Sequence, residues 1–142
     1  MGEGIGDQLT PLKPLPELQI ILANPGIHIS TPVVFQNLKL PLTSEKQDVR
    51  IVARCIEQRL FPELGAGLFN RLETFVLTEY PSVMRLKQEL RRKCAYGTLM
   101  SGSGSTVFSL VAEIEDMQQT PDDLQCKSVF HTQTVPTGLE IA

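Results

Sequence analysis

The sequence has few of the residues that build metal centres and disulfide frameworks. It contains 3 cysteines and 2 histidines. Cys55, Cys94 and Cys126 are far apart, odd in number and without a CxxC pair, so we expect reduced thiols rather than a zinc knuckle or a disulfide framework. His28 and His131 are equally isolated, with no pattern of carboxylates and cysteines around them. We therefore predict no metal site in this chain.

The sequence also lacks the segments that direct proteins into a membrane. No apolar run approaches the roughly 20 residues that a transmembrane helix needs. The first residues show no basic region followed by an apolar core, so we do not expect a secretory signal. Gly6 stands where an N-myristoylation signal needs Ser or Thr. We predict a cytoplasmic protein with no membrane partner.

An excess of positive charge is absent as well. Lys and Arg number 13 against 16 Asp and Glu, for a formal net charge of −3. The one basic cluster, Arg91–Lys93, fits the negative end of a helix dipole and is more simply a solvated helix end than a phosphate site. These features argue against a nucleic-acid or polybasic membrane binder. The length of 142 residues and the 42% hydrophobic content suit one globular domain with a core of its own.

Apolar runs and turn residues predict four strands, over residues 18–23, 96–100, 107–111 and 127–135. Helices are expected from the Ser30–Thr31–Pro32 start, behind a capping box at Ser44–Gln47, and from Pro81 to Lys93. Thr120–Pro121 resembles one more helix start. A further helix is expected to carry four apolar residues at helical spacing, namely Leu68, Leu72, Phe75 and Val76. This order predicts an α+β fold, with a small, mostly antiparallel sheet covered by helices on one face.

A run of small residues, Ser101–Thr106 (SGSGST), separates two of the predicted strands. Glycines let the backbone turn tightly, and consecutive N–H groups with hydroxyls can surround a phosphate. The run has no Walker lysine, and Val107 replaces the third glycine of a dinucleotide fingerprint. The pattern alone leaves two interpretations open, a phosphate-binding loop and a plain hairpin connection.

Five segments, in order, match one enzyme family. They are residues 2–11 (GEGIGDQLTP), 24–35 (NPGIHISTPVVF), 70–73 (NRLE), 80–81 (YP) and 99–108 (LMSGSGSTVF). Over nearly its whole length the chain resembles the C-terminal half of the 4-diphosphocytidyl-2-C-methyl-D-erythritol kinases, in the GHMP kinase superfamily. Such kinases transfer the γ-phosphate of ATP to a hydroxyl of a cytidine-diphosphate methylerythritol, a step of non-mevalonate isoprenoid synthesis.

The resemblance implies a site in a cleft between two domains. Residues 1–16 would be the exit of the first domain with a Pro-rich connector, and residues 17–142 the GHMP-type C-terminal domain. Phe35 would stack on the cytosine, with Thr31 as a nearby polar contact, although a core phenylalanine is the alternative for Phe35. The family's third motif corresponds to the loop near the phosphates, formed by Ser101, Gly102, Ser103, Gly104, Ser105 and Thr106.

Other family elements have no counterpart here. The ATP-binding glycine-rich loop, the lysine near the family's N-terminus and the segment with the catalytic aspartate are absent. The resemblance thus implies ATP and Mg in a complete enzyme, and no catalytic residue and no tightly bound cofactor in this chain alone. Cys94–Ala95 also departs from the family's usual Gly-Ala.

Three hypotheses follow. The chain is a C-terminal kinase domain that is inactive alone, a stand-alone module that senses a nucleotide or binds a protein, or one part of a kinase completed by a separately encoded N-terminal half.

Overall fold

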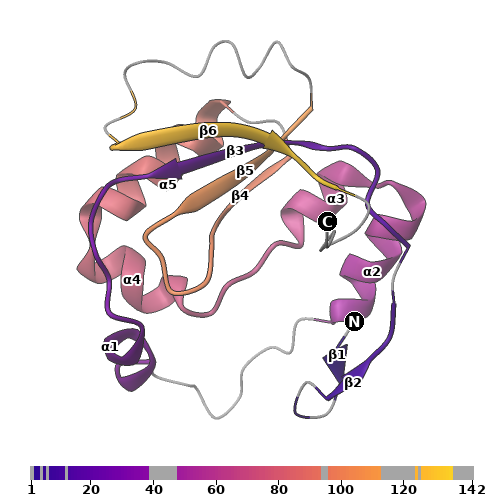
Figure 1. The fold of residues 1–142 in the computed structure, drawn as a ribbon, viewed down its shortest axis with the longest axis horizontal. Coiled ribbons are helices and arrows are strands. Elements are labelled where there is room, and N and C mark those ends of the chain that lie inside the picture. Colours follow the sequence, from indigo (N-terminus) through magenta and orange to yellow (C-terminus); the bar gives the residue numbers. More distant parts are fainter. Residues whose placement is uncertain are drawn as a thin grey trace, which may run out of the picture.

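The main feature of the fold is a four-stranded antiparallel sheet with strand order β4-β5-β3-β6 (Figure 1). The computed structural model describes residues 2–3, 5, 7–11, 13–38, 48–93, 96–112, 124 and 126–135. The sheet strands are β3 (Gln19–Asn24), β4 (Gly97–Met100), β5 (Val107–Val111) and β6 (Ser128–Gln133). A separate ribbon pairs β1 (Gly2–Glu3) with β2 (Gln8–Leu9). All four predicted sheet strands are confirmed.

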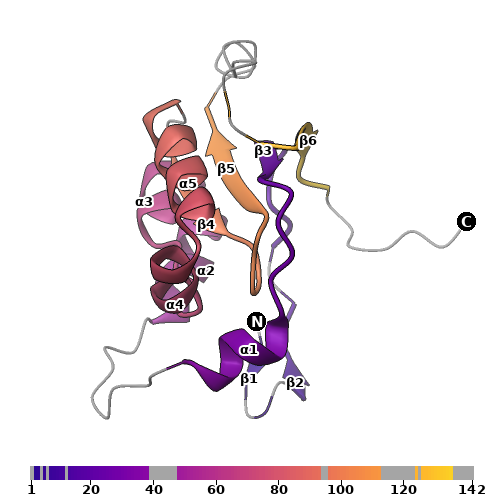
Figure 2. The ribbon, with the colours of Figure 1, turned by 90° about the vertical axis from the view of Figure 1, so that its left-hand side faces the viewer.

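Five helices accompany the sheet in the described part of the chain: α1 (Thr31–Gln36), α2 (Val49–Gln58), α3 (Phe61–Ala66), α4 (Glu73–Glu79) and α5 (Pro81–Lys93). Figure 2 shows α2 to α5 gathered on one side of the sheet. The predicted α+β class is therefore confirmed. Within the described residues, no helix is long and apolar enough to cross a membrane.

One predicted helix is shorter than expected, and α3 was not predicted. Leu68 lies after α3, and Leu72 is the residue before α4, so neither belongs to the helix that carries Phe75 and Val76. Leu68 packs on the cluster of Cys55, Leu64 and Leu110, whereas Leu72, Phe75 and Val76 pack on the main core, so their helical spacing does not reflect one continuous helix. Two signals indicated α3: Pro62 in its first turn and Gly67 at its C-cap. Proline is common where helices begin and glycine where they end.

Three other expectations concern residues outside the described part of the chain: the capping box at Ser44–Gln47, the helix start at Thr120–Pro121, and Cys94–Ala95. In the described residues, α2 is capped by Asp48, whose side chain accepts a hydrogen bond from the backbone N–H of Arg50. Asp is among the preferred N-cap residues because its oxygen satisfies an N–H that has no partner within the helix.

The core lies between the sheet and the helices α4 and α5. Side chains alternate along β3, so Ile21 and Ala23 are buried while the residues between them are half-buried. They pack with buried residues from α4, α5, β4 and β5, including Val76, Val83, Leu86, Leu90, Met100, Val107 and Val111. A second cluster joins α2 and α3 to the sheet through Cys55, Leu64 and Leu110. This packing fixes β4 and β5, and with them the loop that connects them.

Candidate functional site

A hydrogen bond joins two of the predicted site segments. The hydroxyl oxygens of Thr31, the first residue of α1, and Ser103, in the β4–β5 loop, lie 2.7 Å apart. These residues are 72 positions apart in the chain. The structure therefore brings the predicted substrate segment and the small-residue loop together, as a common site requires.

Helix α1 turns its predicted stacking residue outward. Val34 is fully buried, whereas Phe35 is 58% exposed. The alternative of a core phenylalanine is therefore wrong. Thr31 and Phe35 are four residues apart, so they lie on the same face of the helix. The aromatic ring is thus one helical turn from the contact with Ser103.

The first half of the loop forms a tight turn. The N–H of Gly104 donates to the carbonyl of Ser101, and the N–H of Ser101 donates to Thr106. Gly102 has a φ of +54° at the first central position, as in a type II′ turn. A Cβ on Gly102 would have nothing within 4 Å, so this side of the turn is open. The N–H groups of Gly102 and Ser103 donate to no acceptor among the described residues.

The second half of the loop is attached to the segment that follows β3. Ser105 is buried and donates to the carbonyl of Ile27, 2.7 Å away. The amide of Asn24 donates to the hydroxyl of Thr106 at 2.9 Å. The predicted loop residues therefore differ in position: the Ser101–Ser103 part of the turn is accessible to a ligand, Gly104 closes the turn, and Ser105 and Thr106 hold the loop in place.

Asn70, between α3 and α4, also contacts the loop. Its Nδ2 donates to the carbonyls of Met100, at 2.8 Å, and Gly102, at 2.7 Å. Its Oδ1 accepts from the N–H of Leu72, at 3.0 Å. Residues 70–73 are one of the segments that carry the family resemblance, but sequence reasoning assigned them no role. An asparagine between two helices was the only local signal, and it does not identify a partner 30 residues away.

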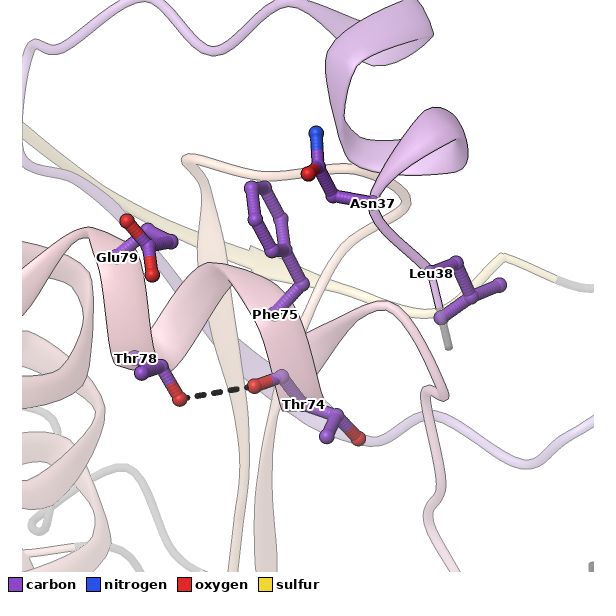
Figure 3. A pocket seen from close by; sticks show the side chains of 6 residues that line it. All are labelled: Asn37, Leu38, Thr74, Phe75, Thr78 and Glu79. Atoms are coloured by element: carbon purple, nitrogen blue, oxygen red, sulfur yellow. Dashed lines mark hydrogen bonds between the residues drawn. The ribbon is translucent and has the colours of Figure 1, made fainter. Parts of the chain in front are cut away.

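A small cavity of about 270 Å³ lies between the end of α1 and α4 (Figure 3). The ring of Phe75 and the side chains of Asn37 and Glu79 border it, and Thr78 donates a hydrogen bond to the carbonyl of Thr74 beside it. The cavity is slightly below the roughly 300–1,000 Å³ of typical small-molecule sites. It is an extension of the surface around α1 rather than a complete ligand pocket.

The described residues offer little to a metal ion. Among them, no three His, Cys, Asp or Glu side chains gather closely enough to hold one. The donors at the candidate site are instead backbone N–H groups and hydroxyls beside an exposed aromatic ring. Such a set can bind phosphate oxygens and a planar base.

Comparisons with known proteins identify relatives of this chain. The chain is 34% identical over 123 residues to a 4-diphosphocytidyl-2-C-methyl-D-erythritol kinase of Caldicellulosiruptor saccharolyticus, covering 87% of this chain and 42% of that protein. It is 44% identical over 110 residues to the kinase of the same name from Geobacter sp. strain M21, covering 78% and 38%. The chain thus spans about two fifths of the length of these curated relatives.

The fold has a solved counterpart. A crystal structure of 4-(cytidine 5'-diphospho)-2C-methyl-D-erythritol kinase superposes with a TM-score of 0.72 at 23% identity, covering 92% of this chain and 47% of that one. The family model "GHMP kinases C terminal" matches residues 52–126, which is more than half of the chain. This chain therefore belongs to the family of GHMP kinase C-terminal domains.

Proposed function

We propose that this chain is the substrate-side part of a kinase that phosphorylates 4-diphosphocytidyl-2-C-methyl-D-erythritol. The names of the relatives support this substrate, and the contact between Thr31 and Ser103 is the observation that carries the proposal. This contact brings together, at one accessible surface, two segments whose sequences resemble those of the kinase family. In this proposal residues 1–16 are a connector from a preceding domain, residues 17–142 are the C-terminal domain, and the location is cytoplasmic.

Each part of the site has a distinct task. The exposed ring of Phe35 stacks on the cytosine, a contact worth about 1–3 kcal/mol per base. The free N–H groups of Gly102 and Ser103 bind phosphate oxygens of the cytidine diphosphate, and the Thr31 hydroxyl adds a polar contact. These contacts hold the substrate in position, and positioning is a large part of catalysis in phosphoryl transfer.

ATP and Mg would belong to the complete enzyme. ATP would supply the transferred phosphoryl group, and Mg would neutralise developing charge. The residues present here do not fit that role, because the sequence contains no family-type ATP loop and the described residues contain no cluster of metal ligands. In this proposal the residues that bind ATP and Mg belong to an N-terminal half, either in the same polypeptide or separately encoded.

Complementation tests the proposal. The purified chain is assayed with ATP, Mg and the methylerythritol substrate, alone and after co-expression with the N-terminal half of the Geobacter relative. We expect no turnover alone and measurable turnover with the added half. Turnover by the chain alone, free of host kinase, contradicts its proposed dependence on that half. Cytidine-nucleotide binding without complementation favours the alternative of a stand-alone nucleotide-sensing or protein-interaction module.

A further inference from the structure

We propose that Asn70 is a positioning residue that orients the phosphate-binding N–H of Ser103. This inference rests on the proposed phosphate role of the loop. Asn70 lies between α3 and α4, outside the loop itself, and is half-buried. Its side chain reaches two carbonyls that flank Ser101, namely those of Met100 and Gly102.

The geometry of the peptide bond explains the effect. The Gly102–Ser103 peptide is trans, so its C=O and N–H point in opposite directions. Asn70 holds the Gly102 carbonyl at 2.7 Å, and this directs the Ser103 N–H away from Asn70. The Ser101–Gly104 hydrogen bond closes this turn and Thr31 contacts the Ser103 hydroxyl, but among the described residues only the Asn70 side chain bonds directly to the Gly102–Ser103 peptide. The amide of Asn70 therefore sets the direction in which the loop presents its donor.

Asparagine is suited to this position by its hydrogen-bonding groups. Its NH₂ group supplies the two donors used on Met100 and Gly102, and its oxygen accepts from Leu72. The opposite orientation of the amide would place its oxygen against two carbonyl oxygens, so the contacts select one orientation. Aspartate and serine can each accept a hydrogen bond near a helix start, but neither can make both donations.

The test compares Asn70→Asp and Asn70→Ser with the intact chain. The probe is inorganic pyrophosphate, titrated while the backbone amide signals of Gly102 and Ser103 are followed by NMR. Melting temperatures are measured in parallel. We expect a saturable shift of the Ser103 signal in the intact chain and at least a tenfold weaker affinity in both variants. The neutral serine variant separates loss of the donors from the added charge of aspartate.

Asp48→Ala is the matched control, because it removes a helix-cap hydrogen bond at α2 and has no contact with the loop. It should lower the melting temperature and leave the Ser103 titration unchanged. An unchanged titration in Asn70→Ser overturns the positioning role, as does an equal loss of affinity in Asp48→Ala. Absence of any shift in the intact chain overturns the phosphate role of the loop itself, and with it the inference.

Discussion

The carboxylate of Glu73 accepts a hydrogen bond from the backbone N–H of Met100, 2.8 Å away. Its other oxygen lies 2.6 Å from the Nζ of Lys87. The two side chains are 13% and 18% exposed, so water screens this pair only partly. One carboxylate therefore links α4 and α5 to the last residue of β4, where the small-residue loop begins.

Replacing Glu73 by Ala should lower the free energy of unfolding by about 2–3 kcal/mol, because it leaves both a charged amine and an N–H without their acceptor. Exchanging the charges, with Glu73→Lys and Lys87→Glu together, should not restore stability, since lysine cannot accept from Met100. Urea denaturation measures both. The exposed Glu79→Ala on the same helix is the control. Recovery of full stability by the charge exchange would contradict the role of the Met100 contact.

Phe35→Ala should weaken binding of cytidine 5'-diphosphate by about 1–3 kcal/mol, whereas Phe35→Tyr should largely retain it, because both Phe and Tyr offer a ring for stacking. The melting temperature should change little, since the ring is 58% exposed. Calorimetric titration measures the affinity. Phe130→Ala removes a ring of similar exposure, 60%, from β6 and serves as the control. Equal affinities for the Phe35→Ala and Phe130→Ala proteins would rule out the stacking role.

The two loop glycines should respond differently to substitution. Gly102 and Gly104 both have positive φ, so a side chain at either costs about 1–3 kcal/mol of strain. A Cβ on Gly104 would also lie 2.9 Å from the sulfur of buried Met100 and 3.2 Å from Ile29, whereas one on Gly102 meets open space. We therefore expect Gly104→Ala to lower the unfolding free energy further than Gly102→Ala, by about 1–3 kcal/mol.

Gly102→Ala should instead reduce pyrophosphate affinity, because its methyl group would stand beside the free N–H groups. In a complemented enzyme, both changes should slow turnover. If turnover survives both Gly102→Ala and Gly104→Ala, the loop is only a connection between strands.

Burial, and secondarily the carboxylate of Glu89, raise the pKa of the Cys126 thiol. The folded state thus favours the neutral thiol. The neutral Cys126 thiol therefore contributes fully to the free energy of unfolding below its pKa in the unfolded chain. This contribution is lost as the pH rises through its higher pKa in the folded chain. Alkylation of Cys126 by iodoacetamide, mapped by mass spectrometry, should therefore begin at higher pH in the folded chain than in urea.

Glu89→Gln should move the alkylation profile of Cys126 to lower pH, and Glu79→Gln should leave it unchanged. Identical profiles in the folded and unfolded chains would show that the thiol experiences neither effect.

Local patterns were sufficient to predict most of the fold. The Pro81 start and the basic end of α5 are encoded within the helix itself, and the β5 run is apolar except for Ser109. The pattern failed at residues 68–72, which precede α4, because apolar spacing alone does not show where a helix begins. The end of α3 is marked by Gly67 at its C-cap, a signal that the spacing of apolar residues does not include.

The site was predictable only in part. Family resemblance predicts roles for Thr31, Phe35 and the loop, and these roles stay predictions; the structure shows that Thr31 contacts Ser103. The contacts of Asn70 and Glu73 with Met100, at the start of the loop, were not predictable, because they join residues about 30 positions apart through tertiary packing. Neither the spacing of apolar residues nor a local motif predicts a contact between residues so far apart in the chain.

The strand order also has a consequence for synthesis of the chain. β3 is complete at Asn24, yet one of its two neighbours, β6, begins only at Ser128. During translation the backbone groups on that side of β3 have no partner until all the other described elements have been made. The fourth strand, β6, can join the sheet only late. Its pairing with β3 brings together residues that are far apart in sequence, and such pairing slows folding. A nascent chain stalled before Ser128 would present β3 as an open edge to chaperones or to other chains.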